Sequence, residues 1–140
     1  MKTHPIAFIK KLILTILLIF LCFNLFSQTQ GQLNEEAFVR YKKVDNELSV
    51  VYQKIISKYA NKTEFINALR ASERIWIQFR DAEVKMKFPA ANPKFEYGSM
   101  YSMCINDLLR ELTLTRLNEL KIWLQPISEG ETCNGSIGDF

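Results

Sequence analysis

Histidine is nearly absent from this chain of 140 residues, and the single one is His4. It lies in an N-terminal segment that has the features of an export signal. A mature domain without histidine cannot use Ser–His or Cys–His nucleophilic catalysis, nor a histidine-bound metal. Catalysis would then depend on carboxylate pairs, and none stands out by its spacing. The sequence therefore predicts a protein that is not an enzyme and that needs no cofactor or metal.

Long apolar runs are confined to the N-terminus. Three lysines within the first 11 residues precede an apolar stretch, Leu12 to Phe26, and the small residue Ser27 follows. This order is typical of a secretory signal peptide, and the run is shorter than the ~20 residues of a membrane-spanning helix. We predict that residues 1–27 are removed and that the exported protein, periplasmic or secreted, has no stable membrane span. Two alternatives remain: an uncleaved N-terminal anchor, and a lipoprotein signal around Cys22.

Neither sign of charge dominates the predicted mature chain. The whole sequence has 18 basic and 15 acidic residues and a net charge of +3, but three of the lysines lie in residues 1–27 and no acid does. The mature chain is therefore neutral. It has no basic patch that would support nucleic-acid binding.

Glycine and proline are also scarce, with five and four residues, and the chain beyond a polar linker (28–34) falls into long segments with a helical period. Apolar residues recur every three or four positions over residues 35–60, 64–87 and 101–124, as they do in amphipathic helices. The sequence predicts an all-α fold, a small antiparallel bundle of three helices that occupies residues 35–124. A polar tail, residues 125–140, follows.

The second and third predicted helices are separated by a segment in which two prolines and a glycine prevent a continuous helix. We predict an irregular loop here. It offers Lys94, Phe95, Glu96 and Tyr97 as possible contacts with a protein partner, because tyrosine is a favoured interface anchor and lysine can pair with a carboxylate. The alternative is that the loop only connects two helices and packs its aromatic side chains on them.

A charged pair stands among large apolar residues in the second predicted helix. Trp76 and Arg80 are four positions apart and share one face, where the guanidinium can stack on the indole. Phe79 and Asp81 flank Arg80, and Arg116 lies on the third predicted helix. We interpret these five residues as a structural clasp between the second and third helices, because arginine suits half-buried ion pairs. The alternative is an exposed binding or catalytic site.

The stretches LRASERIWIQFRDAEV, GSM and TLTRLNEL, with a cysteine between the last two, follow one another along the chain. In this order they resemble the N-terminal domain of the LprI-like lysozyme inhibitors, over roughly residues 44–123. The resemblance implies an exported bacterial protein that inhibits lysozyme. The matching positions are Leu69, Ser72, Glu73, Trp76, Phe79, Arg80, Asp81, Val84, Gly98, Ser99, Cys104, Thr113, Arg116 and Leu120.

Two positions depart from the family pattern. Glu73 stands where the family has glutamine, and Val84 stands where it has a cysteine. The family disulfide from the second to the third helix is therefore expected to be missing. Cys104 and Cys133 remain in the mature chain, and an oxidising compartment outside the cytoplasm favours their pairing. A disulfide would need the tail to run straight back along the third helix, so free cysteines are the alternative.

The leading hypothesis from the sequence is an exported helical binding protein that blocks a lysozyme-type muramidase by protein–protein contact. A second hypothesis is a structural or interaction module of the cell envelope that has no lysozyme target. An enzyme is the weakest of the three hypotheses, because the mature chain has neither histidine nor a nucleophile motif.

Overall fold

The computed structural model describes residues 29–126, 132–135 and 137. The predicted signal peptide lies outside them. All regular structure in the described residues is helical, which confirms the predicted all-α class. None of the described helices is both long and apolar enough to span a membrane. The elements are α2 (Gln30–Lys58), α3 (Thr63–Lys87), α4 (Pro93–Glu96) and α5 (Tyr101–Lys121), with the 3-10 turns η1 (Gly98–Met100), η2 (Ile122–Leu124) and η3 (Thr132–Asn134).

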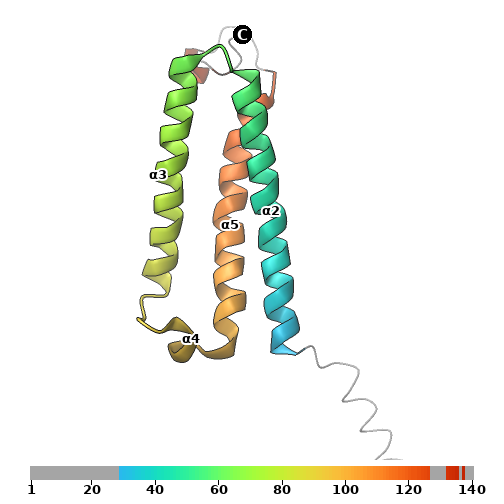
Figure 1. Cartoon of the computed structure of the whole chain (residues 1–140), viewed down its shortest axis with the longest axis vertical. Helices are drawn as coiled ribbons and strands as arrows, with labels where there is room; N and C mark the ends of the chain where they lie inside the picture. The colour runs from blue at the N-terminus through green and yellow to red at the C-terminus, as the bar shows by residue number, and fades with distance from the viewer. Residues whose placement is uncertain (1–28, 127–131, 136, 138–140) are drawn as a thin grey trace, which may run out of the picture.

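The three long helices stand side by side (Figure 1), and α3 runs in the opposite direction to α2 and α5. Polar contacts join α2 to the two 3-10 turns that flank α5, η1 and η2. Near the start of both helices, Asn34 Nδ2 donates to the Ser99 carbonyl at 3.1 Å. Near their far end, Lys58 Nζ donates to the Trp123 carbonyl, also at 3.1 Å. The helices α2 and α5 therefore form the closely packed pair, whereas α3 meets α5 over a shorter stretch.

Helix α2 begins at Gln30, inside the stretch that the sequence predicts as a linker. The reason is a capping box. The Gln32 amide donates to Thr29 Oγ1 at 3.3 Å, and the Thr29 amide donates to Gln32 Oε1 at 2.9 Å. These reciprocal hydrogen bonds satisfy amide groups that a helix start otherwise leaves unpaired. The prediction of a linker over residues 28–34 is therefore wrong from residue 30 onward.

The buried core lies at the end of the molecule where α2 turns into α3. Tyr59 anchors it: the ring centroids of Tyr59 and Phe65 are 4.4 Å apart, and those of Phe65 and Trp123 are 4.7 Å apart. The Tyr59 hydroxyl donates to the Trp123 carbonyl at 3.2 Å. Aliphatic side chains from all three long helices complete this core: Leu48, Val51, Ile55, Ile66, Leu69, Leu117 and Leu120.

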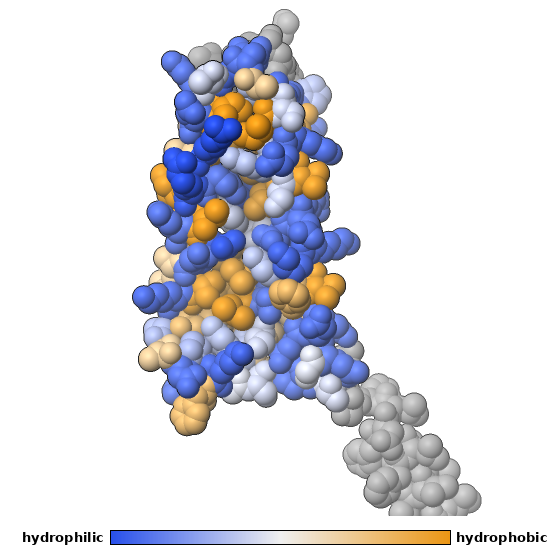
Figure 2. All heavy atoms as spheres, in the orientation of Figure 1, coloured by the Kyte–Doolittle hydropathy of each residue, from blue (hydrophilic) through white to orange (hydrophobic). Residues whose placement is uncertain are grey.

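The half of the molecule nearer to α4 is packed more loosely. Helix α3 buries only Ile66 and Leu69, both in its first turns. Farther along it, Ile75 and Met86 are 65% and 69% exposed. Residues 101–110 of α5 are all partly exposed. Figure 2 accordingly shows apolar surface between hydrophilic side chains in this half. Hydrophobic burial thus holds α3 to the other helices mainly at one end.

The position of the core predicts different costs for two leucines on the same helix. Leu117 is fully buried, and Leu114 is 38% exposed. Leu117→Ala is expected to lower the free energy of unfolding by about 2–5 kcal/mol, because it removes buried methyl groups and leaves a cavity. Leu114→Ala is the matched control and is expected to cost less than about 1 kcal/mol. Urea unfolding measures both; equal losses would contradict this position of the core.

Candidate functional site

Trp76 and Arg80 lie together on α3, as their spacing predicts. The guanidinium carbon of Arg80 is 5.4 Å from the Trp76 ring centroid, within cation–π range. Arg80 also donates to Asp81 Oδ1 from Nε at 2.9 Å and from Nη2 at 2.7 Å. The Arg80 side chain is only 17% exposed, whereas that of Asp81 is 60% exposed. Asp81 therefore neutralises the charge of Arg80 within the same helix. The neighbouring Phe79 side chain is half exposed.

Trp76 and Arg80 face α2, whereas the prediction from the sequence has them contact the third predicted helix, which is α5. Trp76 and Arg80 line a hollow of about 230 Å³ together with Asp45 and Tyr52 of α2. Spacing along α3 establishes that Trp76 and Arg80 share a face. It does not establish which neighbouring helix that face meets, because this depends on how α3 is rotated about its axis.

Tyr41 of α2 lies within the electrostatic reach of the same charges. Burial raises the pKa of its phenol, and the negative charge of Asp45 raises it further, while Arg80 acts in the opposite direction. A phenol in these surroundings stays protonated at pH values above its ordinary pKa. Asp45 and Arg80, which line the hollow between α2 and α3, thus also act on the charge state of Tyr41.

Arg116 provides the polar connection between α3 and α5. Its Nε donates to Glu73 Oε2 at 3.1 Å, and its Nη2 donates to Ser72 Oγ at 3.0 Å. The side chains of Arg116 and Glu73 are 12% and 15% exposed, so this ion pair is mostly shielded from water. Arg116 thus belongs to a clasp between α3 and α5, as the sequence predicts, but its partners on α3 are Ser72 and Glu73 rather than Trp76 and Arg80.

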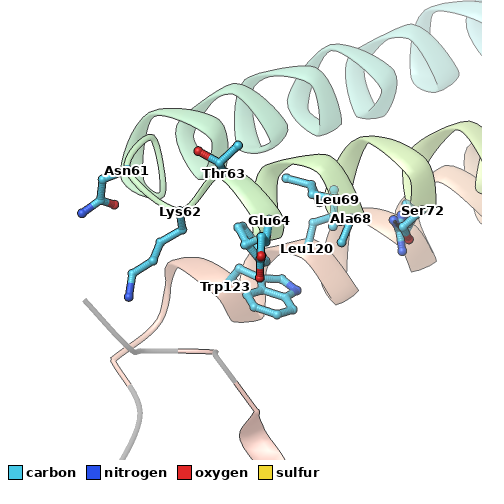
Figure 3. A pocket seen from close by; sticks show the side chains of 11 residues that line it. Asn61, Lys62, Thr63, Glu64, Ala68, Leu69, Ser72, Leu120 and Trp123 are labelled. Carbon is cyan, nitrogen blue, oxygen red and sulfur yellow. Dashed lines mark hydrogen bonds between the residues drawn. The ribbon is translucent and has the colours of Figure 1, made fainter.

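A groove of about 960 Å³ opens next to Arg116, at the end of the molecule that holds the core (Figure 3). Aromatic side chains from two helical elements line it, together with polar side chains from the α2–α3 turn. No pattern in the sequence predicts this groove, because its walls come from segments more than 40 residues apart that only the tertiary structure brings together. Its lining comprises Asn61, Lys62, Thr63, Glu64, Phe65, Ala68, Leu69, Ser72, Arg116, Leu120 and Trp123.

The predicted contact loop forms the opposite end of the molecule (Figure 1). It is less irregular than predicted: residues 93–96 form the helical turn α4, which starts with Pro93, a residue suited to the first helical position. Phe95 is 85% exposed. Tyr97 instead packs on helix ends, with ring centroids 5.4 Å from Phe88 and 6.0 Å from Tyr101. Phe95 is therefore available for contact with a partner, whereas Tyr97 packs on the helices that the loop connects.

Cys104 and Cys133 do not pair. Both are free: Cys104 is half-buried on α5, and Cys133 is exposed in η3. Within the described residues there is also no cluster of three or more His, Cys, Asp or Glu side chains that would hold a metal ion.

Comparison with known proteins identifies one family. The family model described as "Lysozyme inhibitor LprI" matches residues 24–120, more than half of the chain. The match ends at Leu120, in the last turn of α5, and includes Trp76, Arg80 and Arg116. No curated protein and no solved structure is significantly similar to the chain.

The shielded Arg116 contact predicts a larger loss of stability than an exposed ion pair. Arg116→Ala leaves the Glu73 carboxylate without its partner and is expected to lower the free energy of unfolding by about 2–3 kcal/mol. Arg40→Ala is the matched control, because Arg40 pairs with Asp107 at a more exposed site between α2 and α5; it is expected to cost roughly 0–1 kcal/mol. Thermal and urea unfolding of both variants test this, and equal costs would contradict a structural role for Arg116.

The raised pKa of Tyr41 predicts a loss of stability at alkaline pH. The folded protein holds the phenol proton more tightly than the unfolded chain, so this contribution is complete below the ordinary pKa of 10.0 and is lost as the pH rises through the folded-state value. Tyr41→Phe has no proton to release there. Melting temperatures measured below and above pH 10.0 are expected to fall less in Tyr41→Phe than in the wild type. Identical falls would contradict the shift.

Proposed function

The chain belongs to the lysozyme inhibitor LprI family, and on that premise we propose that it is an exported protein that inhibits a lysozyme-type muramidase by protein–protein contact. Residues 1–27 would act as the signal for export to the periplasm or the exterior. The mature domain would be an antiparallel three-helix bundle without catalytic activity of its own. The family match and the helical fold support this proposal.

The observation that carries the proposal is the exposed aromatic side chain at the α4 end. Phe95 is 85% exposed, more than any other large apolar residue in the described part of the chain, and it lies between the exposed Lys94 and Glu96. An aromatic side chain that protrudes from the end of a narrow molecule is suited to enter a cleft. The α4 turn is therefore the proposed element that contacts the muramidase.

The α4 turn stands on a rigid support. Phe88 from the end of α3 and Tyr101 from the start of α5 meet edge to face, with ring centroids 5.3 Å apart, and Tyr97 packs against both. Gly98 follows with a φ of 67°, a backbone conformation that favours glycine, and it redirects the chain into η1. A loop held in one conformation loses less entropy on binding than a mobile one. This aromatic support is the proposed reason why so short a turn would bind.

The charge of Lys94 also supports a contact through the α4 turn. A muramidase acts with a pair of carboxyl groups that flank the scissile glycosidic bond. Lys94 is exposed, and its ammonium group would meet these carboxylates when Phe95 enters the cleft. Because the predicted mature chain is neutral, the attraction would act only at short range.

The motif residues of α3 and α5 have a structural role in this proposal. Trp76, Arg80 and Asp81 would fix α3 against α2, and Arg116 would fix it against α5. The half-exposed Phe79 would belong to the surface beside them. Because α3 leads into α4, its position determines where the contact turn is presented.

Phe95→Ala tests the proposed contact. It is expected to weaken inhibition of cell-wall lysis, followed by turbidity, by about 30-fold, the effect of losing an interface anchor worth about 2 kcal/mol. The melting temperature is expected to stay at the wild-type value, because Phe95 is almost fully exposed. Ile75→Ala is the matched control: Ile75 is 65% exposed on α3, away from α4, and its loss is expected to leave inhibition unchanged.

Two results would count against the proposal. Equal inhibition by Phe95→Ala and the wild type would remove α4 from the contact. Failure of the wild-type protein to slow lysis by several classes of lysozyme would favour the alternative, an interaction module of the cell envelope with no lysozyme target.

A further inference from the structure

The α2–α3 turn, which lines the groove next to Arg116, lies at the end of the molecule opposite α4 (Figure 1), so the proposed contact with a muramidase leaves the groove open. Its volume of about 960 Å³ lies at the upper end of the range found for small-molecule sites, about 300–1,000 Å³. Its lining combines a few aromatic surfaces with several polar groups, as binding sites for small molecules commonly do.

The apolar part of the groove is aromatic. Phe65 and Trp123 are both partly exposed, and Figure 3 shows the Trp123 indole beside the first turns of α3. Their ring centroids are 4.7 Å apart, and Tyr59 packs behind both rings. The two rings are thus fixed by the core. The face of an aromatic ring carries partial negative charge, which attracts the weakly positive C–H groups on the face of a sugar ring.

The polar part of the groove offers both donors and acceptors. Asn61 carries an amide, and Thr63 and Ser72 carry hydroxyl groups. Helix α3 also starts without a side-chain cap, so amide groups of its first turn remain available as donors. Hydroxyl groups of a ligand need partners of both kinds, because each both donates and accepts.

The charges around the groove nearly balance, with two cations, Lys62 and Arg116, against three carboxylates, Glu64, Glu73 and Glu119. Lys62 and Glu64 contribute one charge of each sign and form no ion pair among the described residues. Arg116 is already engaged by Glu73 and Glu119, at 3.1 and 3.2 Å. A strongly charged ligand would therefore gain little net attraction here. A neutral ligand with many hydroxyl groups matches this balance better.

From the fixed aromatic rings, the mixed donors and acceptors and the nearly balanced charge, we propose that this groove is a binding site for a neutral oligosaccharide. One sugar ring would stack on Trp123, and Asn61 and Glu64 would hydrogen-bond its hydroxyl groups. The site is independent of the proposed contact through α4. The same protein would then hold a glycan at one end and a muramidase at the other.

The two tryptophans make the test specific. In a ¹H–¹⁵N NMR spectrum each indole N–H gives one signal; Trp123 lines the groove, and Trp76 lies in the hollow between α2 and α3. The intact protein is titrated with the β-1,4-linked trimer of N-acetylglucosamine, a neutral oligosaccharide. We expect the Trp123 signal to shift and saturate with a dissociation constant on the order of 1 mM or tighter, while the Trp76 signal stays in place.

Variants at the edge of the groove separate binding from folding. Asn61 and Glu64 are exposed, so the double variant Asn61→Ala with Glu64→Ala is expected to fold like the wild type. It should bind the trimer about tenfold more weakly, because two hydrogen bonds are lost. Ser57→Ala is the matched control. Ser57 is exposed on α2 and does not line the groove, so removing its hydroxyl group should leave the dissociation constant unchanged.

Four outcomes would overturn the assignment. The first is no shift of Trp123 at saturating trimer. The second is equal shifts of both tryptophans. The third is unchanged affinity in the double variant. The fourth is a shift of Trp123 with inorganic phosphate but not with the trimer, which would assign the groove to anions at the start of α3. None of these outcomes involves a muramidase, so failure here is distinguishable from failure of the proposed inhibition.

Discussion

The contact of Arg116 with Ser72 and Glu73 is the interaction on which the position of α3 depends. Helix α3 buries only two apolar residues, both in its first turns, so hydrophobic packing secures one end and little of the remainder. Arg116 makes its hydrogen bonds about one turn beyond the last of these buried residues, Leu69. It extends the attachment of α3 to α5 toward the middle of the molecule, and its low exposure protects the ion pair from water and salt.

This uneven attachment gives the molecule two different ends. At the α2–α3 turn, side chains from three helices close a core around Tyr59, and the aromatic groove lies directly on that core. At the other end, α3 and α5 are joined through α4 and the aromatic contacts of Phe88, Tyr97 and Tyr101. A rigid, concave surface suits a small ligand, whereas an exposed aromatic side chain at a narrow tip suits a protein cleft. The structure thus provides two surfaces that suit different classes of ligand.

The motif residues of this inhibitor family make contacts within the fold. The family model is that of a lysozyme inhibitor. The pKa values of Tyr41 and Lys42 are raised. Each of these shifts reflects local charges or burial, chiefly Asp45 in the case of Lys42. Such shifts arise in ordinary ion-pair networks as well as in active sites. The family motif on α3 and α5 likewise forms contacts between helices.

The sequence by itself determined the local features of this protein. A period of three to four residues specified three long helices, and prolines placed the break between the second and the third. The four-residue spacing of Trp76 and Arg80 specified that they stack. Each of these features depends only on residues close together in the chain, so backbone geometry is sufficient to predict it. The start of α2 was missed because the Thr29 capping box stands in a polar stretch without helical periodicity.

Only the tertiary structure decided how the helices face one another. In the folded protein Trp76 and Arg80 face α2, and Arg116 binds Ser72 and Glu73. Phe95 stays exposed while Tyr97 packs against helix ends. The groove lies between α3 and the end of α5. These outcomes depend on the rotation and tilt of each helix. Rotation and tilt are determined by the sum of many packing contacts between distant segments, and no single spacing in the sequence records that sum.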